Sequence, residues 1–224
     1  MQTVIERMKE IQSGQVGVIV SSTKSEDIIA SYNNELYVPL ASAAKVAIGF
    51  AVANMVKNKQ ISWNDMLHQI KFNPKEDSAQ LYPHLQGRDT ISLSKAVEVM
   101  IACHDSYIAK AIVLHCGGWD TVRKYVSTYF PNIHVQENPR DEQNVGELNE
   151  IHSLLVRIFR GYKTEPELWE PIINIGILGV FNEFPLLYVI GGKDLSNRFE
   201  NKEADETIAS VLKYIYDIYI VKAF

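Results

Sequence analysis

The sequence predicts an α+β fold, in which an antiparallel sheet is built from strands near both ends of the chain and flanked by helices. Near the N-terminus, residues 15–22 and 28–32 are rich in β-forming residues and are separated by a polar turn, as in a hairpin. Near the C-terminus, residues 172–180 and 186–190 are two apolar runs of strand length. Between these pairs the patterns favour helices, so we expect a helical lobe beside the sheet.

Helices account for most of the remaining chain. Residues 3–12 place Val4, Met8 and Ile11 on one side, as an amphipathic helix requires. The polar, proline-containing stretches at 71–90 and 131–146 are expected to be connections. Further helices are expected at 42–57, after a cap at 62–65, and at 95–103, 107–115, 119–129, 147–159 and 204–221.

Length and composition favour one globular domain over residues 1–224, because the chain has 224 residues and is 46% hydrophobic. The sheet part would comprise about 1–40 and 165–224, and the helical lobe about 41–164. With 22 basic and 27 acidic residues the formal charge is −5, and no basic run indicates a nucleic-acid partner. Cys103 and Cys116 lack the spacing of a metal site or a disulfide framework, so we expect two buried small side chains and no metal or cofactor.

The sequence contains no uncharged apolar run of transmembrane length, so no membrane span is expected. Residues 1–8 lack the apolar core of a secretory leader. The chain as written is therefore expected to be cytoplasmic, or extracytoplasmic if a leader has been removed. We expect a monomer.

The stretch with the clearest chemical content begins at Ser42 and Lys45. From residue 41 to 56 only Ser42, Lys45 and Asn54 are polar, and a helix that is apolar on nearly every face is normally buried. The spacing of three residues puts the hydroxyl and the amine on one helix face. Apolar surroundings lower the pKa of a lysine towards the range in which it accepts protons. The pair is therefore a candidate activated nucleophile.

The Ser-x-x-Lys spacing occurs four times, at Ser21, Ser42, Ser92 and Ser210, so the spacing alone is weak evidence. Only the copy at Ser42 opens an apolar helix with small neighbours that would let a substrate approach. The alternative is an ordinary helix-start serine with a lysine that extends outwards to water.

The order of several motifs resembles the class A β-lactamase and penicillin-binding-protein group of active-site serine hydrolases. The nucleophile motif of that group is similar to Ser42-Ala43-Ala44-Lys45, which follows Tyr37-Val38-Pro39-Leu40-Ala41. Its second motif region resembles residues 100–110 followed by Gly117-Gly118, and the end of its Ω-loop resembles Asn138-Pro139-Arg140-Asp141. Its last helix resembles residues 204–210 after the C-terminal strands. The resemblance implies the β-lactamase/transpeptidase-like fold.

The resemblance also implies roles for individual residues, with Ser42 as nucleophile and Lys45 as general base. His104-Asp105-Ser106 stands where the family has Ser-Asp-Asn. His104 would replace a proton-shuttling serine, because histidine can relay protons, or it is a lobe histidine with no partner near Ser42. Asp105 would brace the loop or touch substrate. Ser106 would replace a substrate-binding asparagine without its amide donor.

Two family features are missing. Between Pro131 and Asp141 the loop is short, and the only nearby glutamates that could replace the one that orients the hydrolytic water are Glu137 and Glu142, neither of which has the family's Glu-x-x-Leu-Asn context. No Lys-Thr-Gly or Lys-Ser-Gly occurs in the chain. The best-placed substitute is Asn174-Ile175-Gly176, which provides no cation for a substrate carboxylate. Asn174 and Gly176 are therefore expected to bind substrate, and this strand would supply the second oxyanion donor beside the Ser42 N–H.

Two hypotheses follow. The first is a divergent serine hydrolase that forms an acyl-enzyme at Ser42 and acts on a small-molecule or peptide substrate, such as a β-lactam or a related amide or ester. The second is a catalytically degenerate family member that serves as a binding or regulatory module, since a shared fold does not fix function. The chemical reactivity of Ser42 discriminates between them.

Overall fold

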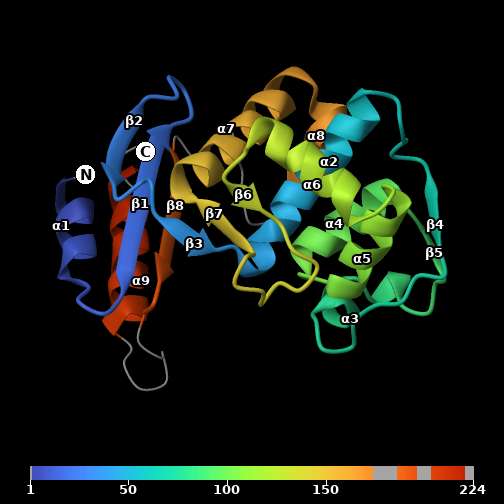
Figure 1. Cartoon of the computed structure of the whole chain (residues 1–224), viewed down its shortest axis with the longest axis horizontal. Helices are drawn as coiled ribbons and strands as arrows, with labels where there is room; N and C mark the ends of the chain where they lie inside the picture. The colour runs from blue at the N-terminus through green and yellow to red at the C-terminus, as the bar shows by residue number, and fades with distance from the viewer. Residues whose placement is uncertain (1, 174–185, 196–202, 220–224) are drawn as a thin grey trace. The chain divides into compact units, whose positions relative to one another are not determined.

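The computed structural model describes residues 2–173, 186–195 and 203–219 (Figure 1). The chain divides into two compact units, of which the first comprises Met1–Pro39, Val145–Val156 and Val180–Phe224 and the second Leu40–Asn144 and Arg157–Gly179. The strands are β1 Gln15–Ser22, β2 Ile28–Tyr32, β3 Tyr37–Pro39, β4 Met66–His68, β5 Thr90–Ser92, β6 Ile133–His134, β7 Val145–Glu147 and β8 Leu186–Lys193. The helices are α1 Gln2–Glu10, α2 Ala44–Lys57, α3 Ser78–Leu81, α4 Leu93–Ala102, α5 Ser106–His115, α6 Trp119–Tyr129, α7 Leu148–Thr164, α8 Pro166–Ile173 and α9 Glu203–Tyr219, with 3₁₀ turns η1 Ala41–Ala43 and η2 Pro83–Leu85.

The first unit contains an antiparallel sheet in the order β2-β1-β8, so the predicted hairpin and the predicted C-terminal strand do share one sheet (Figure 1). Val18 of β1 lies opposite Tyr32 on one side and Ile190 on the other. The predicted strand at 172–180 is wrong at its start, because Ile172 and Ile173 end α8. The rest of that prediction lies outside the described residues.

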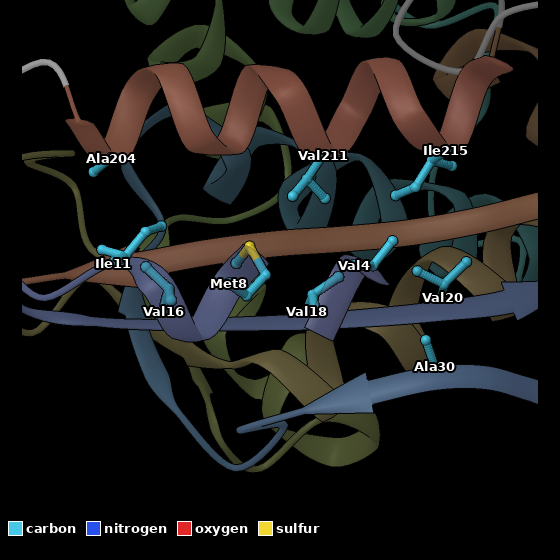
Figure 2. Close-up of a cluster of buried hydrophobic side chains, with 10 residues drawn as sticks. All are labelled: Val4, Met8, Ile11, Val16, Val18, Val20, Ala30, Ala204, Val211 and Ile215. Carbon is cyan, nitrogen blue, oxygen red and sulfur yellow. The ribbon is translucent and has the colours of Figure 1, made fainter. Parts of the chain in front are cut away.

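Both faces of β1 are buried, which explains its nearly continuous apolar sequence. Alternate side chains of a strand point to opposite faces. One set, with Val18, packs against α1 and α9, and Ile19 packs on the other face with Leu148 of α7 and Val189. Figure 2 shows the first cluster, which consists of Val4, Met8, Ile11, Val16, Val18, Val20, Ala30, Ala204, Val211 and Ile215.

The second unit is organised around α2, whose residues from Ala44 to Met55 are almost all buried. This helix packs against α4, α5, α6 and α8, so no face of it is left for water. Phe50 lies among the rings of Tyr129, Phe130 and Trp169, at centroid distances of 5.4, 5.2 and 5.7 Å. The apolar pattern thus predicted correctly that this helix is central.

Two smaller predictions have different outcomes. The helix expected after residues 62–65 is absent, because Asp65 accepts a hydrogen bond from the Ser62 backbone in a turn that leads into strand β4. Cys103 and Cys116 are both buried and free, as predicted. No helix in the described part of the chain is long and apolar enough to cross a membrane.

Candidate active site

Ser42 lies in the 3₁₀ turn η1, directly before α2, and not in the α-helix itself as expected. Its side chain is half-buried. The preceding residue, Ala41, has a φ of +45°. A residue with a Cβ adopts this left-handed conformation at a cost of about 1–2 kcal/mol. The candidate nucleophile therefore follows a strained peptide unit.

Asn144 holds this strained turn in place from a fully buried position. Its backbone carbonyl accepts a hydrogen bond from the Leu40 N–H at 2.8 Å. Its side-chain nitrogen donates to the carbonyls of Ala41 at 3.4 Å and Pro139 at 3.1 Å, and its side-chain oxygen accepts from the Gln136 N–H at 3.1 Å. The sequence does not indicate this role of Asn144, because nothing in its local pattern predicts a contact with residue 41.

Lys45 is in the first turn of α2, only 6% exposed, and its Nζ donates a hydrogen bond to Ser42 Oγ at 3.5 Å. Burial lowers the pKa of the Lys45 ammonium from its ordinary value, and the negative charges of Glu76 and Asp105 oppose this shift. The structure thus brings the predicted hydroxyl and amine together, with the amine biased towards its proton-accepting form.

Two other Ser-x-x-Lys pairs have different surroundings. Ser92 caps helix α4 by accepting a hydrogen bond from the Lys95 backbone, and the Lys95 ammonium pairs with the partly buried Glu98. Ser21 is buried in β1 and makes a 2.7 Å hydrogen bond with His152 Nε2. In these pairs the serine has a structural partner, so the same spacing serves a different purpose.

Asp105 is fully buried at the N-cap of α5. Its Oδ1 accepts hydrogen bonds from the backbone N–H groups of Tyr107 and Ile108, at 2.9 and 3.0 Å. Its Oδ2 accepts from the Asn73 N–H at 3.0 Å. Both oxygens are therefore occupied in holding the start of α5 against the segment at residue 73, which fits the bracing role.

Ser106 forms a polar network with Asn73 and Glu76, two residues that no sequence motif indicated. Its hydroxyl donates to Glu76 Oε1 at 3.2 Å and accepts from Asn73 Nδ2 at 2.9 Å. Asn73 Nδ2 also donates to Glu76 Oε1 at 3.1 Å. Asn73-Pro74 is a turn signal, but no sequence spacing indicates that this turn reaches Ser106. The position expected to bind substrate therefore presents a carboxylate as well as a hydroxyl.

His104 is exposed and has a φ of +54°. It makes no hydrogen bond or ion pair to any residue in the described ranges. The ring is therefore accessible to solvent, and its proposed relay role depends on a substrate or on water.

The two glutamates expected near the site have no arrangement that would mark either as a base. Glu137 is exposed and pairs with Lys110 at 3.3 Å. Glu142 is exposed. Asn174 and Gly176, the predicted substrate-binding residues of the C-terminal strand, lie outside the described residues.

The arrangement of Ser42 and Lys45 can support nucleophilic attack, because a buried amine can take the proton that the hydroxyl loses. The N–H of Ser42, in the 3₁₀ turn directly before α2, is a candidate for stabilising an oxyanion. Within the part of the chain that the structure describes, no group of three or more His, Cys, Asp or Glu side chains could hold a metal ion.

Comparisons with known proteins identify the family. The sequence model of the beta-lactamase enzyme family matches residues 1–176 of this chain. The chain therefore belongs to the beta-lactamase enzyme family. A comparison with curated proteins finds no significant match.

Solved structures with the same architecture include an ancestral (GNCA) class A β-lactamase. It is 13% identical, the match covers 100% of this chain and 99% of that one, and the TM-score is 0.70. A variant of the last common ancestor of Gram-negative bacteria class A β-lactamase is 14% identical, with 97% of each chain covered and a TM-score of 0.69. At these identities the likeness establishes the fold, which is that of class A β-lactamases.

Proposed function

We propose that this member of the β-lactamase family is a serine hydrolase that forms an acyl-enzyme at Ser42 with Lys45 as general base. The single observation that carries the proposal is the buried Lys45 amine, whose Nζ lies 3.5 Å from Ser42 Oγ. A hydroxyl needs an adjacent base because it is a weak nucleophile at its ordinary pKa. No other role explains as simply why a lysine is buried beside a serine at the start of an apolar helix.

The proposed reaction begins when Ser42 Oγ attacks the carbonyl carbon of an amide or ester and its proton passes to Lys45 Nζ. The bond from the carbonyl carbon to the leaving nitrogen or oxygen then breaks, and the leaving group takes up a proton. His104 is the proposed relay for that proton, since its ring is accessible and a histidine side chain can both accept and donate a proton. Water would finally hydrolyse the acyl-enzyme and release the free acid.

The last step is expected to be slow. A hydrolytic water needs a general base, and such a base contributes about 10²–10⁴-fold to a rate. Glu137 is exposed and paired with Lys110, so it offers no such base. We therefore propose a β-lactam or a related amide or ester as substrate, with acylation faster than deacylation.

The test is intact-protein mass spectrometry after incubation with a penicillin, followed by peptide mapping. Ser42→Ala should abolish the adduct. Ser92→Ala is the matched control, because Ser92 shares the Ser-x-x-Lys spacing but caps α4. An adduct of the intact penicillin mass that maps to Ser42 and persists for hours supports the proposal. An adduct that remains in Ser42→Ala contradicts it.

The second candidate function is a binding or regulatory module without turnover. The observation that favours it is the sequence itself, which contains no Lys-Thr-Gly to hold a substrate carboxylate. Failure of Ser42 to react with penicillins and with activated esters would favour this candidate.

A further inference from the structure

Two carboxylates act on the Lys45 ammonium, and they differ in what else they do. Asp105 is fully buried, and its two oxygens accept three backbone hydrogen bonds. Its charge therefore serves the protein's own backbone, and its full burial leaves neither oxygen accessible to a ligand. Glu76 is half-buried and has no such set of backbone donors.

Glu76 uses one oxygen and leaves the other open. Its Oε1 accepts from Ser106 Oγ and from Asn73 Nδ2. Across residues 2–173, 186–195 and 203–219, no hydrogen bond reaches Oε2, and no lysine or arginine forms an ion pair with this carboxylate. A partly desolvated carboxylate that forms no ion pair retains most of its attraction for a positive charge.

The carboxylate is also held in one place. Asn73, which donates to it, is itself fixed by a hydrogen bond from its backbone N–H to Asp105 Oδ2 and by one from the Lys75 N–H to its side-chain oxygen. Ser106 begins helix α5, directly after the Asp105 cap. Because these hydrogen bonds already restrict the carboxylate, it loses little conformational entropy when a ligand binds.

We propose that Glu76 is a specificity-determining residue whose carboxylate receives a protonated amine of the acyl donor. The inference rests on the proposed function, because it assigns the chemical class of the substrate that Ser42 would take. Glu76 accepts a hydrogen bond from Ser106, which directly follows Asp105. The charges of both carboxylates act on Lys45, which in turn contacts Ser42. An acyl group on Ser42 would therefore carry its nearest substituents into the field of this carboxylate.

The negative charge of Glu76 determines which substrates we expect it to favour. The open oxygen of Glu76 can accept a charge-assisted hydrogen bond from an ammonium, and the same charge repels a substrate carboxylate placed there. A neutral acyl side chain is neither attracted nor repelled by the charge of Glu76. The preferred acyl donor is thus one with an amine near the reacting carbonyl.

The experiment compares two penicillins that differ by one group, benzylpenicillin and its α-amino derivative ampicillin. The rate of adduct formation at Ser42 is measured by quenched-flow mass spectrometry at about pH 6.5, where an α-amine is mostly protonated. The α-amino compound is expected to react about tenfold faster, which corresponds to one charge-assisted hydrogen bond. The quantity compared between variants is the ratio of the two rates. A change in the reactivity of Ser42 or Lys45 alters both rates equally and therefore leaves this ratio unchanged.

Glu76→Gln should reduce this ratio to about one, because glutamine keeps an oxygen for Ser106 and Asn73 but removes the charge. Glu170→Gln is the control, since Glu170 is an exposed carboxylate on α8 and its replacement changes net charge equally. The preference should also vanish at about pH 9, where the amine is neutral.

Equal rates for the two penicillins in the wild-type protein, or a preference that survives Glu76→Gln, would overturn this assignment and leave the acyl-enzyme intact. An absence of any Ser42 adduct with both compounds counts against the proposed function, and the Glu76 assignment falls with it.

Discussion

The side chain of Asn144 donates a hydrogen bond to the carbonyl of Ala41, the residue whose left-handed backbone directly precedes Ser42. A strained conformation persists only when its surroundings hold it. The buried asparagine joins the turn at residue 41 to the loop at residues 136–139. The position of the candidate nucleophile is therefore set by a residue about a hundred positions further along the chain.

Asn144→Ala should lower the free energy of unfolding by about 2–3 kcal/mol, because it leaves buried backbone groups without hydrogen-bond partners. The rate of Ser42 acylation should fall as well, since the turn at residue 41 loses its support. Urea denaturation and adduct kinetics measure the two effects. Asn64→Ala removes an exposed asparagine and is expected to change stability by less than about 0.5 kcal/mol. Equal behaviour of the two variants would show that Asn144 does not hold the turn.

Asp105→Ala should also destabilise the fold by about 2–4 kcal/mol, because three backbone N–H groups lose a charged acceptor. Asp105→Asn should cost less, since the amide oxygen can still cap α5 while its nitrogen cannot accept from Asn73. Chemical denaturation of the two variants gives the comparison. Unchanged stability with lost acylation would indicate instead that Asp105 acts on the substrate.

His104→Ala tests the proposed proton relay. If His104 protonates the leaving group, His104→Ala should slow the turnover of an ester with a poor leaving group by about 10²–10⁴-fold, and it should affect an ester with a good leaving group much less. The variant should fold normally, because the side chain is exposed. The measurement is the rate of hydrolysis of both esters by the wild-type protein and the variant. Equal rates in the two proteins for both esters would remove His104 from the mechanism.

The buried pair of His152 and Ser21 predicts how stability depends on pH. Burial lowers the pKa of His152 from its ordinary value of 6.5 in the folded protein. As pH falls below about 6.5, the unfolded chain therefore takes up a proton before the folded protein does. The stabilisation from neutral His152 is complete above this pH and decreases as pH falls towards the lowered folded pKa.

Urea unfolding at a series of pH values should thus show a loss of stability below about pH 6.5 that His152→Gln reduces. His134→Gln is the control, because His134 is exposed. The difference between the two variants isolates the buried ring from the titration of carboxylates at lower pH. Parallel curves for both variants would mean that the ring titrates alike in the folded and unfolded states.

The sequence predicted those helices and strands whose apolar pattern lies within the element itself. The apolar helix around Phe50, the amphipathic helix with Val4 and Met8, and the strands of the hairpin each carry a periodicity that follows from their own burial. The order of elements predicted that the N-terminal and C-terminal strands share one sheet. It did not predict that β1 pairs with β8 or in which register, because both depend on contacts across the whole chain.

The site was predictable only where its residues are neighbours in sequence. Ser42 and Lys45 are three positions apart, so helical geometry alone brings them together. Asn73, Glu76 and Asn144 reach the same region through loops whose course no periodicity encodes. The apolar residues Ile172 and Ile173 were assigned to a strand because a short apolar run does not distinguish a strand from the end of a buried helix.

The role of Lys45 as general base is decided by the rate of Ser42 acylation as a function of pH, measured in the wild-type protein and in Lys45→Met. Because burial lowers the pKa of Lys45, the wild-type rate should rise with pH up to that lowered value and then level off. Lys45→Met keeps the apolar volume but removes the base, so its rate should be lower by about 10²–10⁴-fold and lose this rise. Lys95→Met, the equivalent change in the pair at Ser92, should behave like the wild type. Acylation of Lys45→Met at the wild-type rate and with the wild-type profile would contradict the claim that Lys45 is the base.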